Sequence, residues 1–103
     1  MLKVSLGTIK GRHNLPVTSY IFNEEIKNVT DVEKIENDVK TYFISNILPM
    51  KADDDVQVIL YITGLTIVTL AVVKACKVCG CELVCMHYDR DSDTYIAQKI
   101  IEI

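Results

Sequence analysis

The sequence predicts one small α/β domain in which a mixed sheet of about five strands is covered by two helices. The chain has 103 residues, which is room for a single hydrophobic core. Short apolar or alternating segments predict strands, and two longer segments carry apolar residues at helical spacing. Half of the residues are hydrophobic and 24% are charged, so the chain is expected to fold as one domain over residues 1–103.

Two strands are expected first. Residues 2–6 alternate between apolar and polar side chains, which is the period of a half-buried strand. Residues 7–16 contain two glycines, an asparagine and a proline and therefore predict a loop. Residues 17–22 are rich in β-branched and aromatic side chains and predict a second strand, and the two strands could pair as a hairpin.

A first helix is expected to begin at a capping box. In residues 30–33, Thr-Asp-Val-Glu, the Thr30 side chain can accept from the amide of Glu33, whose own side chain reaches back to the Thr30 amide. Pro49 is expected to end this helix. Its apolar positions recur at helical spacing and predict a face that covers the sheet: Val32, Ile35, Val39, Tyr42, Phe43 and Ile47.

A longer apolar run, residues 56–75, is about long enough to cross a membrane. Gly64 and several threonines interrupt it, and its first half is β-branched, so a buried strand over residues 56–62 and a helix are the better division. That helix is expected from about Leu65 to Cys79, with Gly80 as a left-handed stop. Because its polar positions are few, we expect a second subunit to cover part of it.

The rest of the chain predicts two more strands. Residues 82–88 should form a strand parallel to residues 56–62, since a helix connects them in a β-α-β unit of the Rossmann-like kind. Residues 89–93 are polar and predict a turn. Residues 94–103 should then return as a final strand antiparallel to the fourth.

Ligands of such sheets settle beyond the carboxyl ends of parallel strands, where helix N-termini offer free amides. Three segments are expected at that edge: residues 63–66, residues 87–90 and, only if the first strand runs parallel to the third, residues 11–14. The candidate ligand-binding residues are Arg12, His13, Asn14, Thr63, Gly64, Leu65, Thr66, His87, Asp89 and Arg90. The two arginines and the helix N-terminus suit phosphate, while Asp89 or Asn14 suit a base or a ribose, so a nucleotide-like ligand is predicted.

A purely structural interpretation stays open for the same residues. Thr66 could simply cap the helix, His87 could be an ordinary strand residue, and residues 89–93 could be a solvated turn. In a third interpretation His13 and His87 act as an acid–base pair that cleaves a phosphodiester, provided that both reach one cleft.

Metal binding is weighed for two motifs. Residues 89–93 imitate the start of a calcium loop, but Thr94 stands where that loop needs glycine and Ile100 where it needs glutamate. Four closely spaced cysteines could hold zinc or an iron–sulfur cluster, although buried free thiols are the commoner case: Cys76, Cys79, Cys81 and Cys85. No metal or cofactor is therefore assigned.

The net charge argues against one class of binding partner, and the N-terminal sequence argues against secretion. The formal net charge is −3 and the basic residues are scattered, which argues against duplex DNA as a partner. The first residues lack the pattern of a secretory signal, so a cytoplasmic protein is expected.

Residues 61–66, Tyr-Ile-Thr-Gly-Leu-Thr, with the strand that ends in residues 86–89, Met-His-Tyr-Asp, resemble the core of CARF domains, the CRISPR-associated Rossmann-fold sensors. The resemblance covers under a third of the chain. It departs at Leu65 and Ile67, where that family has a second glycine and a lysine.

The resemblance implies a homodimer that binds a cyclic oligonucleotide across its two-fold axis, with residues 63–66 of both subunits facing the ring. A chain of this size is also similar to small phage proteins that sequester the nucleotide signals of bacterial immunity. The leading interpretation is thus an oligomeric nucleotide-binding protein without catalysis. A metal-independent phosphodiesterase, or ring nuclease, and a structural or protein-interaction module are its alternatives.

Overall fold

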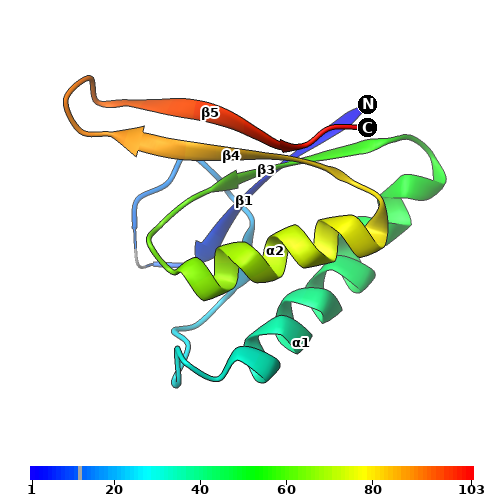
Figure 1. The fold of residues 1–103 in the computed structure, drawn as a ribbon, viewed down its shortest axis with the longest axis horizontal. Coiled ribbons are helices and arrows are strands. Elements are labelled where there is room, and N and C mark those ends of the chain that lie inside the picture. The colour runs from blue at the N-terminus through cyan, green and yellow to red at the C-terminus, as the bar shows by residue number, and fades with distance from the viewer. Residues whose placement is uncertain (12) are drawn as a thin grey trace.

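The computed structural model describes residues 1–11 and 13–103 and shows a two-layer α/β fold. A five-stranded mixed sheet forms one layer, and both helices lie together on one of its faces (Figure 1). The predicted fold class is thereby confirmed. The elements are β1 (Leu2–Ile9), β2 (Tyr20–Phe22), α1 (Val32–Tyr42), β3 (Val56–Tyr61), α2 (Thr66–Cys79), β4 (Glu82–Asp89) and β5 (Thr94–Ile101).

The strand order in the sheet is β2-β1-β3-β4-β5. Strand β3 is central and pairs in parallel with both β1 and β4, whereas β5 runs antiparallel to β4 along one edge. The first strand is therefore parallel to the third, and the carboxyl ends of β1, β3 and β4 meet at one edge. This is the arrangement that the predicted ligand site required.

The expected hairpin between the first two strands is wrong. Strand β2 pairs with β1 in parallel, with Gly7 opposite Tyr20, and it spans only three residues. The connecting segment returns only as far as Gly7, in the second half of β1, and tertiary packing directs its path. A Cβ atom at Gly7 would lie 2.5 Å from the ring of Tyr20 and 3.0 Å from Leu15, so the absence of a side chain at Gly7 lets both pack across β1.

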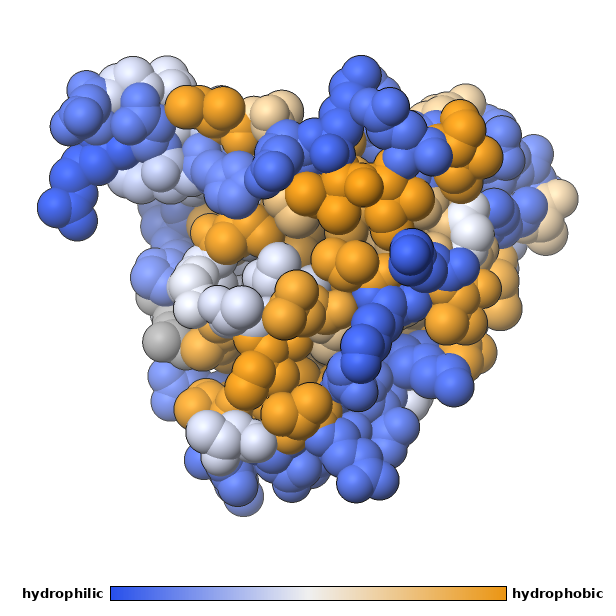
Figure 2. Space-filling view, in the orientation of Figure 1, coloured by the Kyte–Doolittle hydropathy of each residue, from blue (hydrophilic) through white to orange (hydrophobic). Residues whose placement is uncertain are grey.

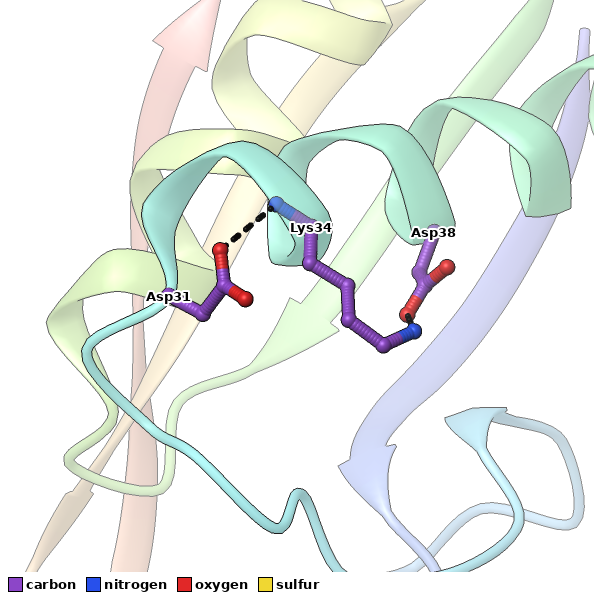
Figure 3. A network of polar contacts seen from close by, with 3 residues as sticks. All are labelled: Asp31, Lys34 and Asp38. Atoms are coloured by element: carbon purple, nitrogen blue, oxygen red, sulfur yellow. Dashed lines mark hydrogen bonds and ion pairs between the residues drawn. The ribbon is translucent and has the colours of Figure 1, made fainter.

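The N-terminus of α1 lies one residue later than the expected capping box. Asp31 is the N-cap, and its carboxylate accepts a 3.2 Å hydrogen bond from the amide of Lys34. The Lys34 ammonium also pairs with Asp38 at 3.0 Å, so this lysine links both carboxylates along the first turns (Figure 3). The hydroxyl of Thr30 instead donates to the side chain of Asn28, which is why Thr30 does not cap the helix.

Pro49 does not end the helical path directly. After α1 the chain continues through a π-helical turn (Phe43–Ile47) and a 3₁₀ turn (Leu48–Ala52) that contains Pro49 near its start. The buried residues recur every four positions, which exceeds the 3.6 residues of an α-helical turn. The wider π turn keeps the last of these residues facing the sheet. The series is Ile35, Val39, Phe43 and Ile47.

The hydrophobic core lies between the sheet and the two helices. In β3 the residues Val56, Val58 and Leu60 are buried and face the helices, whereas the alternate residues of this strand are half-buried on the other face. Helix α2 has the predicted extent, and Gly80 ends it in the predicted left-handed conformation with φ of 69°. Among the described helices, none is both long and apolar enough to cross a membrane.

Candidate functional site

Two hydrogen bonds hold the carboxyl edge of the sheet together. The hydroxyls of Thr8, at the end of β1, and Thr63, just after β3, bond to each other at 2.5 Å. The amide of Ile62 donates to the carbonyl of Met86 in β4 at 3.0 Å. Thr8 is buried, so this contact fixes the backbone from which the loop between β3 and α2 departs.

The loop between β3 and α2 leaves the helix N-terminus accessible. Gly64 has φ of 90°, a conformation that favours glycine, and no atom lies within 4 Å of where its Cβ would be. Leu65 is the N-cap, so no side chain caps this helix, and the interpretation of Thr66 as the cap is wrong. Amides of the first turn are consequently available to an acceptor.

A hollow of about 650 Å³ opens at this edge, on the face of the sheet that carries no helix. We call it the edge hollow. It is lined by His13, Asn14, Leu15, Pro16, Ile62, Thr63, Tyr88, Asp93 and Tyr95. Its volume lies within the roughly 300–1,000 Å³ that small-molecule sites occupy.

Aromatic rings form one wall of the edge hollow. Tyr95 lies between two tyrosines, with ring centroids 4.9 Å from Tyr61 and 5.5 Å from Tyr88. The hydroxyl of Tyr88 donates to the carboxylate of Asp93 at 2.7 Å, and this bond raises the pKa of Tyr88. The hydrogen bond, the edge-to-face contact of Tyr95 with Tyr61 and its tilted contact with Tyr88 fix the orientation of Tyr88 and Tyr95.

The second hollow of this region lies on the helix side of the sheet, between α2 and strands β4 and β5, and we call it the helix groove. Its volume is about 380 Å³, and Gly64, Thr66 and His87 contribute to its lining. The Nε2 atom of His87 lies 2.8 Å from the side-chain oxygen of Gln98. Because successive strand residues point to opposite faces, His87 and its neighbour Tyr88 belong to different hollows.

The structure thus places the predicted site residues in different hollows. His13, Asn14 and Thr63 meet in the edge hollow, while Gly64, Thr66 and His87 meet in the helix groove. Leu65 lines a smaller hollow of about 260 Å³ against the start of α1. The two histidines consequently face different hollows within one chain, which is not the single cleft that the acid–base interpretation required.

The remaining predicted residues lie in or near turns. Asp89 accepts a 2.7 Å hydrogen bond from the hydroxyl of Ser92, and Arg90 is exposed in the turn between β4 and β5. Arg12 lies outside the described residues. The prediction missed Tyr95 and Asp93, whose signal is the turn itself: pairing β4 with β5 across residues 89–94 sets Tyr95 opposite Tyr88.

All four cysteines are buried free thiols near the end of α2 and in or beside β4. Burial raises the pKa of each thiol, which keeps them protonated and unreactive near neutral pH. Within residues 1–11 and 13–103, no group of three or more histidine, cysteine or acidic side chains is placed to hold a metal ion. The described thiols therefore act as packing groups.

Comparison with known proteins found no relative. No protein-family model matches the chain, and neither the curated proteins nor the solved structures contain a significant match.

Proposed function

We propose that this protein binds a nucleotide-derived small molecule in the edge hollow. One observation carries the proposal: the parallel sheet brings aromatic rings, an amide, a hydroxyl and an imidazole from four chain segments around one hollow of about 650 Å³. Convergent polar groups beside aromatic walls at the carboxyl edge of an α/β sheet are the usual form of a small-molecule site.

The lining groups match the parts of a nucleotide. The rings of Tyr88 and Tyr95 offer faces on which a base can stack, and each such contact is worth about 1–3 kcal/mol. The Asn14 side chain can pair with the base edge, because it carries both a donor and an acceptor. The Asp93 carboxylate can accept from ribose hydroxyls while it still accepts from Tyr88.

A phosphate bound in the edge hollow would lie beside the Thr63 hydroxyl and the His13 imidazole, which both line it. The uncapped first turn of α2 begins three residues after Thr63, but its first residue, Thr66, lines the helix groove on the other face of the sheet. The same turn carries the resemblance to nucleotide sensors, so cyclic nucleotides and short cyclic oligonucleotides are the first ligands to test.

Binding without cleavage is the better-supported form of this function. His13 and His87 face different hollows, so one chain does not present both to a single scissile phosphate. We therefore favour sequestration of a cytoplasmic signal, the role of a phage protein that counters host immunity, over hydrolysis.

The test measures binding and cleavage together. The purified protein is titrated by calorimetry with cyclic dinucleotides, cyclic oligoadenylates, AMP and ADP-ribose, and native mass spectrometry then shows whether the bound ligand stays intact. We expect an intact ligand and a rise in melting temperature, since a ligand specific for the folded state stabilises that state. Failure of every compound to bind would reject the proposal, and recovered cleavage products would support the phosphodiesterase.

Matched variants locate the site. Tyr95→Leu removes a stacking surface and should weaken binding roughly 5- to 150-fold, which corresponds to about 1–3 kcal/mol. Lys99→Ala is the control, because Lys99 lies on the same strand and the same face but outside the edge hollow. Equal affinities for both variants would show that the ligand binds elsewhere.

A further inference from the structure

The edge hollow carries negative charge beside its aromatic wall. Among its described lining residues the Asp93 carboxylate is the only charged group when His13 is neutral. The turn that bears Asp93, residues 89–93, holds three carboxylates and one guanidinium. This turn projects at the upper left of the molecule and is strongly hydrophilic (Figure 2). This end of the hollow therefore favours a positively charged group.

The two tyrosine rings of the hollow are close enough to share one cation. The centroids of Tyr88 and Tyr95 are 5.5 Å apart, and a cation is attracted to an aromatic face when it lies within about 6 Å of the centroid. A single positive group against this wall can therefore lie within that range of both rings. The hydrogen bond to Asp93 raises the pKa of Tyr88, which keeps this ring uncharged near neutral pH.

The Asp93 carboxylate is fixed beside these rings. Its Oδ1 atom accepts the 2.7 Å hydrogen bond from Tyr88, and within the described residues no ion pair involves this carboxylate. The backbone of Asp93 has φ of 52°, a left-handed conformation that asparagine also tolerates. An asparagine at this position should thus keep the backbone and the bond from Tyr88 while it removes the charge.

We propose that the ligand of the edge hollow is a nucleotide whose base carries a positive charge, held by Tyr88, Tyr95 and Asp93. This inference rests on the proposed function and narrows it to one class of base. A flat cationic ring gains the stacking that every base gains, and it is also attracted to the tyrosine faces and to the carboxylate. Pyridinium and N-alkylated purine nucleotides belong to this class.

The two charges of such a ligand suit different parts of the hollow. Thr63 bonds to Thr8 at the end of β1, whereas Asp93 belongs to the turn between β4 and β5. In the sheet order these segments lie on opposite sides of β3. A phosphate beside Thr63 is therefore on the side away from Asp93, and the hollow can match a negative group and a positive group at once.

Calorimetric titration with oxidised and reduced nicotinamide mononucleotide tests the charge directly. The two compounds share the ribose and the phosphate, and the oxidised ring carries a positive charge that the reduced ring lacks. The oxidised compound should bind roughly 3- to 30-fold more tightly. AMP is titrated alongside as a nucleotide with a neutral base.

Matched substitutions in one turn identify the group that attracts the cation. Asp93→Asn should abolish most of the preference for the oxidised compound and change the affinity for the reduced compound by less than about twofold. Asp91→Asn is the control, because it removes the same charge from the same turn but Asp91 does not line the edge hollow. This control should keep the preference, and circular dichroism melts confirm that both variants are folded.

The outcomes separate this inference from the proposed function. Equal affinities of the wild type for the oxidised and reduced compounds, or binding of AMP alone, would overturn the inference and leave nucleotide binding in place. A preference that survives in Asp93→Asn, or that is lost equally in Asp91→Asn, would overturn the assigned contact. Failure of all three nucleotides, and of the cyclic nucleotides and ADP-ribose, would reject the proposed function as well.

Discussion

At the scale of single residues, Gly7 decides how the first loop packs. Its hydrogen occupies the space where a Cβ would lie 2.5 Å and 2.6 Å from two ring atoms of Tyr20. The positioned ring holds β2 beside β1, and the same loop carries His13 and Asn14 into the edge hollow. The absence of a side chain at Gly7 is therefore required for the loop that forms one wall of the edge hollow.

The substitution Gly7→Ala should therefore destabilise the fold by about 1–3 kcal/mol, the usual cost of forcing an extra methyl group into a packed site. Urea unfolding followed by circular dichroism measures it. In a Tyr20→Ala background most of this penalty should disappear, because the ring that clashes is gone. An equal penalty in both backgrounds would show that the Tyr20 ring is not the cause.

Part of the candidate site could be predicted from the sequence, because its residues follow predicted strands directly. Residues 63–66, 87 and 88 could be assigned to one sheet edge from the β-α-β pattern alone. The strand pattern also predicts that His87 and Tyr88 point to opposite faces of the sheet, because successive residues of a strand alternate between the two faces. The contribution of Tyr95 required the register of β4 with β5, which depends on the geometry of the turn.

At the scale of elements, α2 was predictable because its signals are local. Its apolar run and Gly80 mark its extent, and the observed helix ends as expected. A tertiary contact also stabilises the end of the helix, because the Lys51 ammonium donates a 2.5 Å hydrogen bond to the carbonyl of Gly80. The pairing of β2 was not predictable in this way, because it depends on contacts between Gly7, Leu15 and Tyr20.

The buried thiols at the end of α2 predict a loss of stability in alkaline solution. Burial raises the pKa of Cys76 in the folded state, whereas an unfolded thiol ionises near about pH 8.5. The free energy of unfolding is therefore unaffected by this group below that pH and falls as the pH rises further, because only the unfolded state then loses the proton.

Urea unfolding at pH 7.5 and 9.5 checks this effect. Between these values the wild type should lose about 1.4 kcal/mol more than Cys76→Ala, because the unfolded thiol changes from mostly protonated to mostly ionised across this range. Lysines and tyrosines titrate equally in both proteins and cancel in the difference. Identical losses would mean that Cys76 ionises as readily in the folded state as in the unfolded one.

At the scale of the whole molecule, the sheet separates two surfaces. The edge hollow opens on the side without helices, and the helix groove lies on the side with them. Neighbouring residues of β4 and β5 point to opposite faces of the sheet and so line different hollows, and among the described residues only Ile62 lines both the edge hollow and the helix groove. Ligand binding in the edge hollow is therefore expected to be largely independent of the helix groove.

The substitution Leu70→Glu tests this independence, because Leu70 lines the helix groove and is 56% exposed. The affinity for the nucleotide that the wild type binds should change by less than about twofold, a coupling free energy below about 0.4 kcal/mol. Calorimetric titration of the variant measures it, with Leu48→Glu as the control, because Leu48 is 44% exposed and lines neither hollow. A loss of more than tenfold, confined to Leu70→Glu, would mean that the second subunit expected on α2 contributes to the site and that the ligand spans a two-fold axis.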